Sequence, residues 1–142
     1  GANKTIVLLS REFNSGTHIF FKEHILRRGV VKGPEEFSPA ALMMPSSQAI
    51  IEEVMANASA IGYVGLGYLT AKEKALAVAK SSGSLYIIPS IKTVTAKQYP
   101  ISRSLLFYAN GEPSGEVRSF IDYVLSPAGQ KVVLKMDFVP IK

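Results

Sequence analysis

The densest group of chemically useful side chains in this sequence lies at residues 10–17. The stretch reads Ser-Arg-Glu-Phe-Asn-Ser-Gly-Thr, and it follows an apolar β-rich run and precedes a helix-forming run. Such strand-to-helix junctions bind ligands in α/β folds, because the first N–H groups of a helix lack intrahelical acceptors and carry the positive end of its dipole. The stretch therefore indicates a site for a small oxyanion.

The candidate ligands of that anion are Arg11, Ser15, Gly16 and Thr17. The arginine offers a planar two-donor fork to a tetrahedral oxyanion, the hydroxyls add donors, and the glycine lets the backbone approach a ligand closely. The spacing alone leaves a structural alternative equally open, in which a serine or threonine hydroxyl only caps the helix. In that alternative Arg11 pairs with Glu12 or Glu23.

The elements that position these residues follow from the hydrophobic pattern. Apolar, β-rich runs predict strands at residues 5–9, 61–65, 75–79, 85–88 and 103–109. Helical spacing of apolar residues predicts helices at residues 17–28, 46–58, 113–125 and about 128–136, with a short helical or irregular segment at 89–100 and a polar connection at 32–45. Strands alternating with helices predict an α/β fold with a mixed, mainly parallel sheet flanked by helices.

Composition limits the class of protein. The chain has 142 residues, of which 47% are hydrophobic, enough for one compact domain. Its longest apolar runs are far shorter than the roughly 20 residues needed to cross a bilayer, so we expect no membrane insertion. The absence of cysteine excludes disulfides, thiolate metal sites and cysteine nucleophiles. No export signal opens the sequence, which indicates either a chain without one or a mature chain.

The net charge of +5 favours an anionic partner in general. Lysine and arginine are scattered, however, and the densest basic spot is Arg27-Arg28 with Lys32 behind it. Aromatic and basic residues do not alternate as they do in nucleic-acid binders, so we expect no nucleic-acid partner. The alternative, a basic nucleic-acid binder, predicts an affinity for DNA or RNA that falls steeply as the salt concentration rises.

Catalytic and metal-binding patterns are missing from the sequence. His18 and His24 are six residues apart, which does not place them on one helix face, and no carboxylate cluster completes a metal site. No Gly-x-Ser-x-Gly elbow supports a serine nucleophile. The glycines at 62, 65 and 67 lack the order of a nucleotide loop and indicate tight backbone packing. We therefore expect no enzyme, no metal and no cofactor.

The motif Arg-x-x-x-Ser-Gly-Thr is followed by further distinctive segments. They are Ala-Ile-Gly-Tyr-Val-Gly at 60–65, Tyr-Pro-Ile-Ser-Arg at 99–103, the run at 114–130 and Phe-Val-Pro at 138–140. In this order they resemble segments of bacterial periplasmic phosphate-binding proteins, the receptors of phosphate ABC transporters in the type II periplasmic-binding-protein superfamily. The resemblance implies one lobe of a clamshell receptor that binds inorganic phosphate through Arg11, Ser15, Gly16 and Thr17 without transforming it.

Two positions depart from the pattern of that family. Some members have an aspartate two residues after the arginine, where it helps to orient the guanidinium, but this chain has Phe13. Another residue must then orient Arg11, and Glu12 is a candidate. Ser104 stands where the family usually has proline, which affects the entry of a strand and not the anion.

The resemblance also implies a domain organisation and a cellular setting. Residues 1–98 would form the anion-binding lobe, and residues 99–142 a return strand and C-terminal helices that pack towards a first lobe with no counterpart here. A single domain over 1–142 is the alternative. The implied partners are phosphate and, in the full-length context, an ABC transporter permease. The implied location is periplasmic or extracellular, with lipid anchoring of the full-length protein left open.

Two points stay open at the level of sequence. Donor groups alone do not separate phosphate from sulfate, arsenate and other tetrahedral oxyanions. The second hypothesis keeps the fold but makes the chain a self-associating interaction domain without ligand binding, in which the exposed faces of the C-terminal helices form a homo-oligomer.

Overall fold

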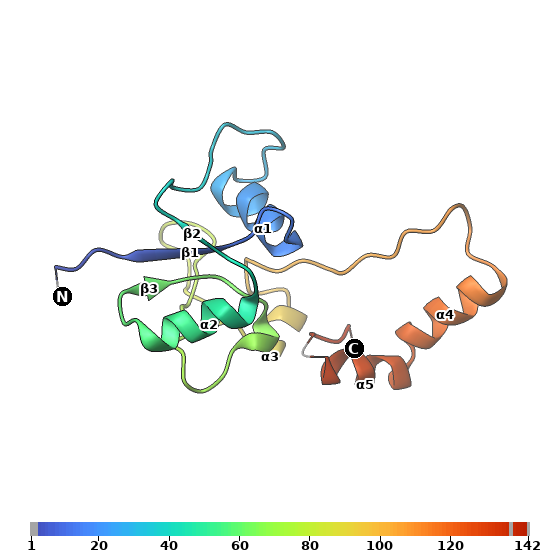
Figure 1. Ribbon diagram of the computed structural model, residues 1–142. Coiled ribbons are helices and arrows are strands. Elements are labelled where there is room, and N and C mark those ends of the chain that lie inside the picture. The colour runs from blue at the N-terminus through green and yellow to red at the C-terminus, as the bar shows by residue number, and fades with distance from the viewer. Residues whose placement is uncertain (1–2, 137, 142) are drawn as a thin grey trace. The chain divides into compact units, whose positions relative to one another are not determined.

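The computed structural model describes residues 3–136 and 138–141 and divides the chain into two compact units, Gly1–Lys74 and Ala75–Lys142 (Figure 1). The first unit holds the three strands of the sheet, and the second holds three of the helices. The functional division at residue 99 rests on the family resemblance and stays a prediction.

A three-stranded parallel sheet organises the first unit. Its strands are β1 (Val7–Arg11), β2 (Leu42–Met44) and β3 (Ala60–Ile61), arranged in the order β2-β1-β3. Both neighbours of β1 run parallel to it, with Arg11 opposite Met44 and Val7 opposite Ala60. Parallel pairing needs crossover connections, which α-helices usually provide. The predicted α/β fold with a mainly parallel sheet is confirmed.

Helices lie on both sides of this sheet, with α1 and α2 on opposite sides of the strands (Figure 1). Helix α1 (Gly16–Phe21) continues as a π-helical turn, η1 (Lys22–Leu26), and α2 (Ser47–Ala56) follows β2. Ser46 caps α2, because its hydroxyl accepts a hydrogen bond from the backbone N–H of Ala49 at 3.0 Å. A 3₁₀ turn, η2 (Leu66–Tyr68), follows the sheet.

The buried apolar residues of the first unit come from β1 and α2. Leu9, Ile50 and Ile51 are 3%, 1% and 5% exposed. Gly62 lies against them: a Cβ at this position would come within 2.5 Å of Ile50 Cγ2 and 3.3 Å of Leu9 Cβ. The close packing expected of this glycine is therefore present.

The second unit is built from short helices. They are α3 (Ile91–Thr95), α4 (Gly115–Leu125) and α5 (Pro127–Lys135). The turn from α4 into α5 is fixed by Ser126, which caps α5, and by Gln130, whose amide donates to the carbonyl of Val124 and accepts from the N–H of Ile141, both at 2.8 Å. The predicted helices at 113–125 and 128–136 are confirmed.

The strand predictions need correction. The runs at 75–79 and 85–88 form only one antiparallel bridge, between Val78 and Ile87, and the structure has no strand at 103–109. An apolar run becomes a strand only when its backbone finds a hydrogen-bonding partner, which a pattern within one segment cannot supply. For the same reason the pattern missed β2, which lies within the predicted polar connection and pairs with β1.

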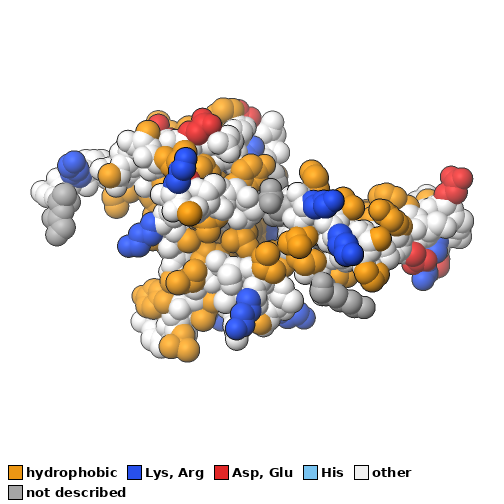
Figure 2. Space-filling model, turned by 90° about the horizontal axis from the view of Figure 1, so that it is seen from below, with side chains coloured by type: hydrophobic (Ala, Val, Ile, Leu, Met, Phe, Trp, Pro, Cys, Tyr) orange, Lys and Arg blue, Asp and Glu red, His pale blue; other side chains and the backbone are white. Residues whose placement is uncertain are grey.

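Large apolar side chains remain exposed on α4 and on the extended segment before it, and Figure 2 shows hydrophobic side chains among charged ones over the C-terminal part of the chain. Members of this set, defined here as the C-terminal apolar surface, are Leu105, Leu106, Phe107, Tyr108, Val117, Phe120 and Tyr123, each more than half exposed. Single exposed apolar residues are ordinary, but a contiguous set usually marks an interaction surface. Within the described residues, no helix is both long and apolar enough to traverse a bilayer.

Candidate functional site

The starts of two helices meet the same edge of the parallel sheet. Strand β1 ends at Arg11 and leads into α1, and β2 ends at Met44 and leads into α2. Because β1 and β2 are adjacent and parallel, with Arg11 opposite Met44, their carboxyl ends lie side by side. The positive ends of two helix dipoles therefore approach the edge where Arg11 leaves the sheet.

The guanidinium of Arg11 is held by the start of α2. Its Nη1 donates to Ser47 Oγ at 3.0 Å, and its Nη2 donates to the carbonyl oxygen of Pro45 at 3.2 Å. The Nε atom is buried and has no hydrogen-bond partner within the described part of the chain. The predicted orientation of Arg11 by Glu12 is wrong, because neutral oxygens of another segment do this instead.

Arg11 forms no ion pair within the described part of the chain. The ion pairs among residues 3–136 and 138–141 are Lys22–Glu36, Arg27–Glu36 and Arg118–Asp122. Neither Glu12 nor Glu23 pairs with Arg11, so this part of the structural alternative is wrong. A guanidinium with neutral partners retains its full attraction for an anion.

Residues 15–17 form the start of α1. Ser15 is the N-cap residue, but its hydroxyl makes no capping hydrogen bond, and its backbone carbonyl accepts the first helical bond, from Ile19 N at 3.0 Å. Ser15 is buried, Gly16 is exposed and Thr17 is half-buried. Since the Ser15 hydroxyl does not cap the helix, it remains available as a donor, and the N–H groups of Gly16 and Thr17 precede the first intrahelical bond.

A buried polar network joins the end of β1 to α1. The hydroxyl of Ser10 lies 2.7 Å from the hydroxyl of Tyr63 and 3.1 Å from His18 Nδ1. Tyr63 also accepts from the backbone N–H of Arg11 at 3.5 Å. Ser10 and His18 are 1% and 2% exposed, so both polar side chains are satisfied away from solvent. The network positions the strand end from which Arg11 projects.

Aromatic rings enclose His18. The ring of Phe37 lies 4.6 Å from its centroid, and the ring of Phe13 meets it edge-on at 5.3 Å. Burial lowers the pKa of His18 below its usual range, and nearby Lys22 lowers it further, against the opposing effects of the Arg11 backbone and Glu36. His18 is therefore a buried structural histidine, and it belongs to no metal site among the described residues.

The remaining chemical candidates are not assembled into sites. No group of three or more His, Cys, Asp or Glu side chains close enough to hold a metal occurs among the described residues. Ser10 lies beside a histidine but is buried, so a substrate cannot reach its hydroxyl in this arrangement.

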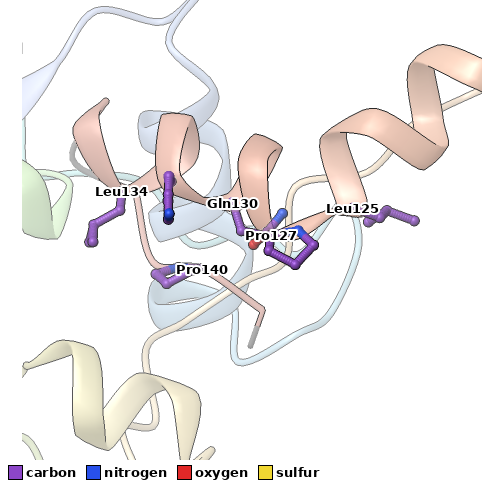
Figure 3. A pocket seen from close by; sticks show the side chains of 6 residues that line it. Leu125, Pro127, Gln130, Leu134 and Pro140 are labelled. Carbon is purple, nitrogen blue, oxygen red and sulfur yellow. The ribbon is translucent and has the colours of Figure 1, made fainter.

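The open pocket of Figure 3, about 420 Å³ in the second unit, is lined by Leu125, Pro127, Gln130, Lys131, Leu134 and Pro140. The amide of Gln130 is already hydrogen-bonded through both its nitrogen and its oxygen, which leaves Lys131 as the other polar side chain of this lining.

Sequence reasoning missed Pro45, Ser47 and Tyr63 as parts of the site. The hydrophobic pattern placed Ser47 only within the predicted helix at 46–58, and Tyr63 only within the predicted strand at 61–65. No signal in the sequence relates either residue to Arg11, because 36 and 52 residues separate them. The pairing of β1 with β2 and β3 brings these segments to Arg11.

Comparison with known proteins identifies a matching family model and relatives that are all described as phosphate-binding proteins. The family model described as "PBP superfamily domain" matches residues 1–128. The curated phosphate-binding protein PstS of Pseudomonas aeruginosa is 33% identical over 99% of this chain and 43% of its own length. PstS 2 of Streptococcus pneumoniae is 32% identical over 99% of this chain and 47% of its own length.

Solved structures agree with these relatives. A phosphate-binding protein of a phosphate ABC transporter from Streptococcus pneumoniae superposes with a TM-score of 0.75 at 30% identity, covering 98% of this chain and 52% of that one. A putative phosphate ABC transporter substrate-binding protein from Clostridium perfringens, solved with bound phosphate, gives the same TM-score and identity, with coverages of 100% and 54%. The chain thus spans about half the length of the relatives it matches.

Proposed function

Because this chain belongs to the PBP superfamily domain family, we propose that it binds inorganic phosphate at the carboxyl edge of its parallel sheet. The observation that carries the proposal is the position of Arg11 at the edge where α1 and α2 begin, with no carboxylate partner among the residues that the structure describes. Relatives described as phosphate-binding proteins support phosphate as the anion.

In the proposed site each residue supplies donors to a tetrahedral oxyanion. Arg11 provides charge-assisted hydrogen bonds, and the hydroxyls of Ser15 and Thr17 add neutral ones. The backbone N–H groups at the start of α1, with Gly16 leaving the approach open, complete the donor set. Nothing in this set attacks or protonates the anion, so phosphate is held and released unchanged.

The proposal also covers the full-length receptor to which this chain would belong. We propose that it is the substrate-binding protein of a phosphate ABC transporter, which delivers phosphate to the permease from the periplasm or the extracellular face. A lipid anchor on the full-length protein fits an extracellular setting. Residues 1–98 would carry the anion site and residues 99–142 the segment that packs on the rest of the receptor.

A site with donors on only one side of the anion should bind phosphate weakly. We expect a dissociation constant on the order of millimolar for this chain alone, against micromolar or tighter for an enclosed site, a difference of about 4 kcal/mol. The difference arises because a second lobe would add donors and exclude water. Micromolar binding by a demonstrated monomer would contradict the one-sided site.

Calorimetric titration of phosphate into the chain tests the proposal, with sulfate as competitor. We expect Arg11→Ala to remove the phosphate-dependent heat. Arg28→Ala is the matched control, because it removes the same charge from an exposed position of the same unit. No heat from the unaltered chain at roughly tenfold the expected dissociation constant, or equal losses in both variants, would overturn the proposal.

The C-terminal apolar surface favours a second candidate function, a self-associating interaction domain. Its side chains lie on α4 and on the extended segment before it, where a second copy of the chain could cover them. Light scattering across a range of concentrations separates the two functions. A mass that rises with concentration, together with no response to phosphate, selects the interaction domain.

A further inference from the structure

The two serines at the start of α2 bond to different partners. Ser46 caps the helix through its hydroxyl, which accepts from Ala49 N at 3.0 Å. Ser47, the next residue, makes no cap and instead accepts a hydrogen bond from Arg11 Nη1 at 3.0 Å. Ser47 is 5% exposed, so water cannot easily replace it as the partner of Arg11.

We infer that Ser47 is a positioning residue for phosphate binding: with the carbonyl of Pro45, it holds the guanidinium of Arg11 in the orientation that receives the anion. The inference rests on the proposed function. It assigns to a serine of α2 the orienting task that Phe13 cannot perform, because a phenylalanine has no acceptor for a guanidinium.

Two hydrogen bonds to the segment at residues 45–47 fix the guanidinium of Arg11 more firmly than one bond would. Nη1 donates to the Ser47 side chain and Nη2 to the Pro45 backbone, so the plane of the guanidinium is set at two points. The Nε atom, which joins the guanidinium to the rest of the side chain, is buried, so this end of the group is enclosed by protein. Arginine has five donors, so three N–H groups remain outside these two bonds. A preordered side chain loses less conformational entropy when the anion arrives.

Both acceptors of Arg11, the Ser47 hydroxyl and the Pro45 carbonyl, are uncharged. A carboxylate in the place of Ser47 would orient Arg11 but would also offset its positive charge. A hydroxyl and a carbonyl orient the group and leave that charge available to the ligand. The arrangement therefore favours affinity for anions in general, including sulfate, rather than discrimination among them.

The inference is tested by titrating inorganic phosphate into Ser47→Ala and Ser46→Ala. We expect Ser47→Ala to weaken binding about five- to tenfold, because it frees the guanidinium. Ser46→Ala is the matched control: it removes a neighbouring hydroxyl that bonds Ala49 and not Arg11, and we expect the affinity to stay within about twofold. Equal losses in both variants would indicate only damage to α2 and would overturn the inference.

A double-variant cycle separates positioning from a structural role. In an Arg11→Lys background there is no guanidinium for Ser47 to orient, so Ser47→Ala should then change the affinity by less than about twofold. If Ser47→Ala weakens binding equally in both backgrounds, Ser47 does not act through Arg11, and the inference is wrong.

A measurement without ligand covers the case in which the affinity is too weak to titrate. We expect the Nη–H signals of Arg11 in side-chain NMR spectra to be separate, because both nitrogens are hydrogen-bonded, and to merge in Ser47→Ala. Arg28, which is exposed, supplies merged reference signals. Merged Arg11 signals in the unaltered chain would refute the inference.

The two proposals fail in different ways. If Arg11→Ala leaves the phosphate heat unchanged, the proposed site is wrong. If Arg11→Ala removes the heat but Ser47→Ala leaves the affinity within about twofold, only the positioning role is wrong.

Discussion

In the first unit Ile50 of α2 is 1% exposed, whereas in the second unit Val117 and Phe120 of α4 are 55% and 59% exposed. Both helices have apolar residues at helical spacing and both form as the sequence predicts. The difference lies in what covers them: α2 packs on a sheet, whereas α4, in the described part of the chain, contacts α5 and, through Phe120, the ring of Phe107. Amphipathic spacing thus specifies a helix without specifying what its apolar face will meet.

Most of the buried polar side chains among the described residues lie in the first unit: they are Ser10, Ser15, His18 and Ser47, against Gln130 in the second. In the first unit the hydroxyl of Ser10 and the ring of His18 are buried and bonded to each other. In the second unit the ion pair between Arg118 and Asp122 lies on an exposed helix face, with 57% and 58% of the side chains accessible. Buried hydrogen bonds hold an orientation, and exposed pairs contribute little. The first unit is therefore the one suited to a site of fixed geometry.

The largest expected effect comes from truncating the buried helix face. Ile50→Ala removes a fully buried side chain and should lower the free energy of unfolding by about 2–5 kcal/mol. The matched change in the second unit, Val117→Ala, should alter it by less than about 0.5 kcal/mol, because Val117 is exposed.

Urea unfolding followed by residue-resolved NMR measures both changes in their own units. Similar losses in the two variants would mean that α4 is covered in solution, for example by a second copy of the chain. That result would remove the contrast between the units.

A smaller effect is expected from the polar network. Tyr63→Phe removes the hydroxyl that bonds Ser10 at 2.7 Å and should lower the stability of the first unit by about 1–2 kcal/mol. Tyr123→Phe, at an exposed position of α4, should leave the second unit unchanged. Hydrogen exchange at the amides of β1 and α4 reports the two units separately. Unaltered protection of β1 in Tyr63→Phe would show that the network does not hold the strand end.

The smallest expected effect depends on pH. Burial lowers the pKa of His18, so below about pH 6.5 the unfolded chain takes up a proton that the folded chain does not. Because the unfolded state then binds more protons, the first unit loses stability as the pH falls from about 6.5 to the lowered pKa, and the loss stops below it. Above about pH 6.5 this contribution is complete.

Urea midpoints measured across this pH range test the effect in the unaltered chain and in two variants. His18→Gln should flatten the dependence, while His24→Asn should retain it because His18 is still present. Both histidines lie in the first unit, so amides of the second unit should not follow this dependence. Equal slopes in the unaltered chain and in His18→Gln would contradict the assignment.

Much of the candidate site could be predicted because its signals are local. Arg11 at a strand end and Ser15-Gly16-Thr17 at a helix start follow from a hydrophobic run, a glycine and hydroxyl residues within a short stretch. The partners of Arg11 could not be predicted, since Ser47 reaches it only through the pairing of β1 with β2. Strand β2 belongs to a short apolar run at residues 40–44, but a run this short, rich in alanine, leucine and methionine, does not distinguish a strand from a helix.

The sequence by itself determined the helices at 17–28, 46–58, 113–125 and 128–136 in position if not in exact bounds, the parallel α/β class, and the family through its ordered motifs. Those features depend on local spacing, capping and turn residues, which neighbouring positions supply. Only the tertiary structure decided that the run at 103–109 is not a strand, that His18 is buried, and that Ser47 accepts a hydrogen bond from Arg11. Each of these depends on which distant segments pair, because backbone hydrogen bonds and burial are properties of contacts between segments and not of any one of them.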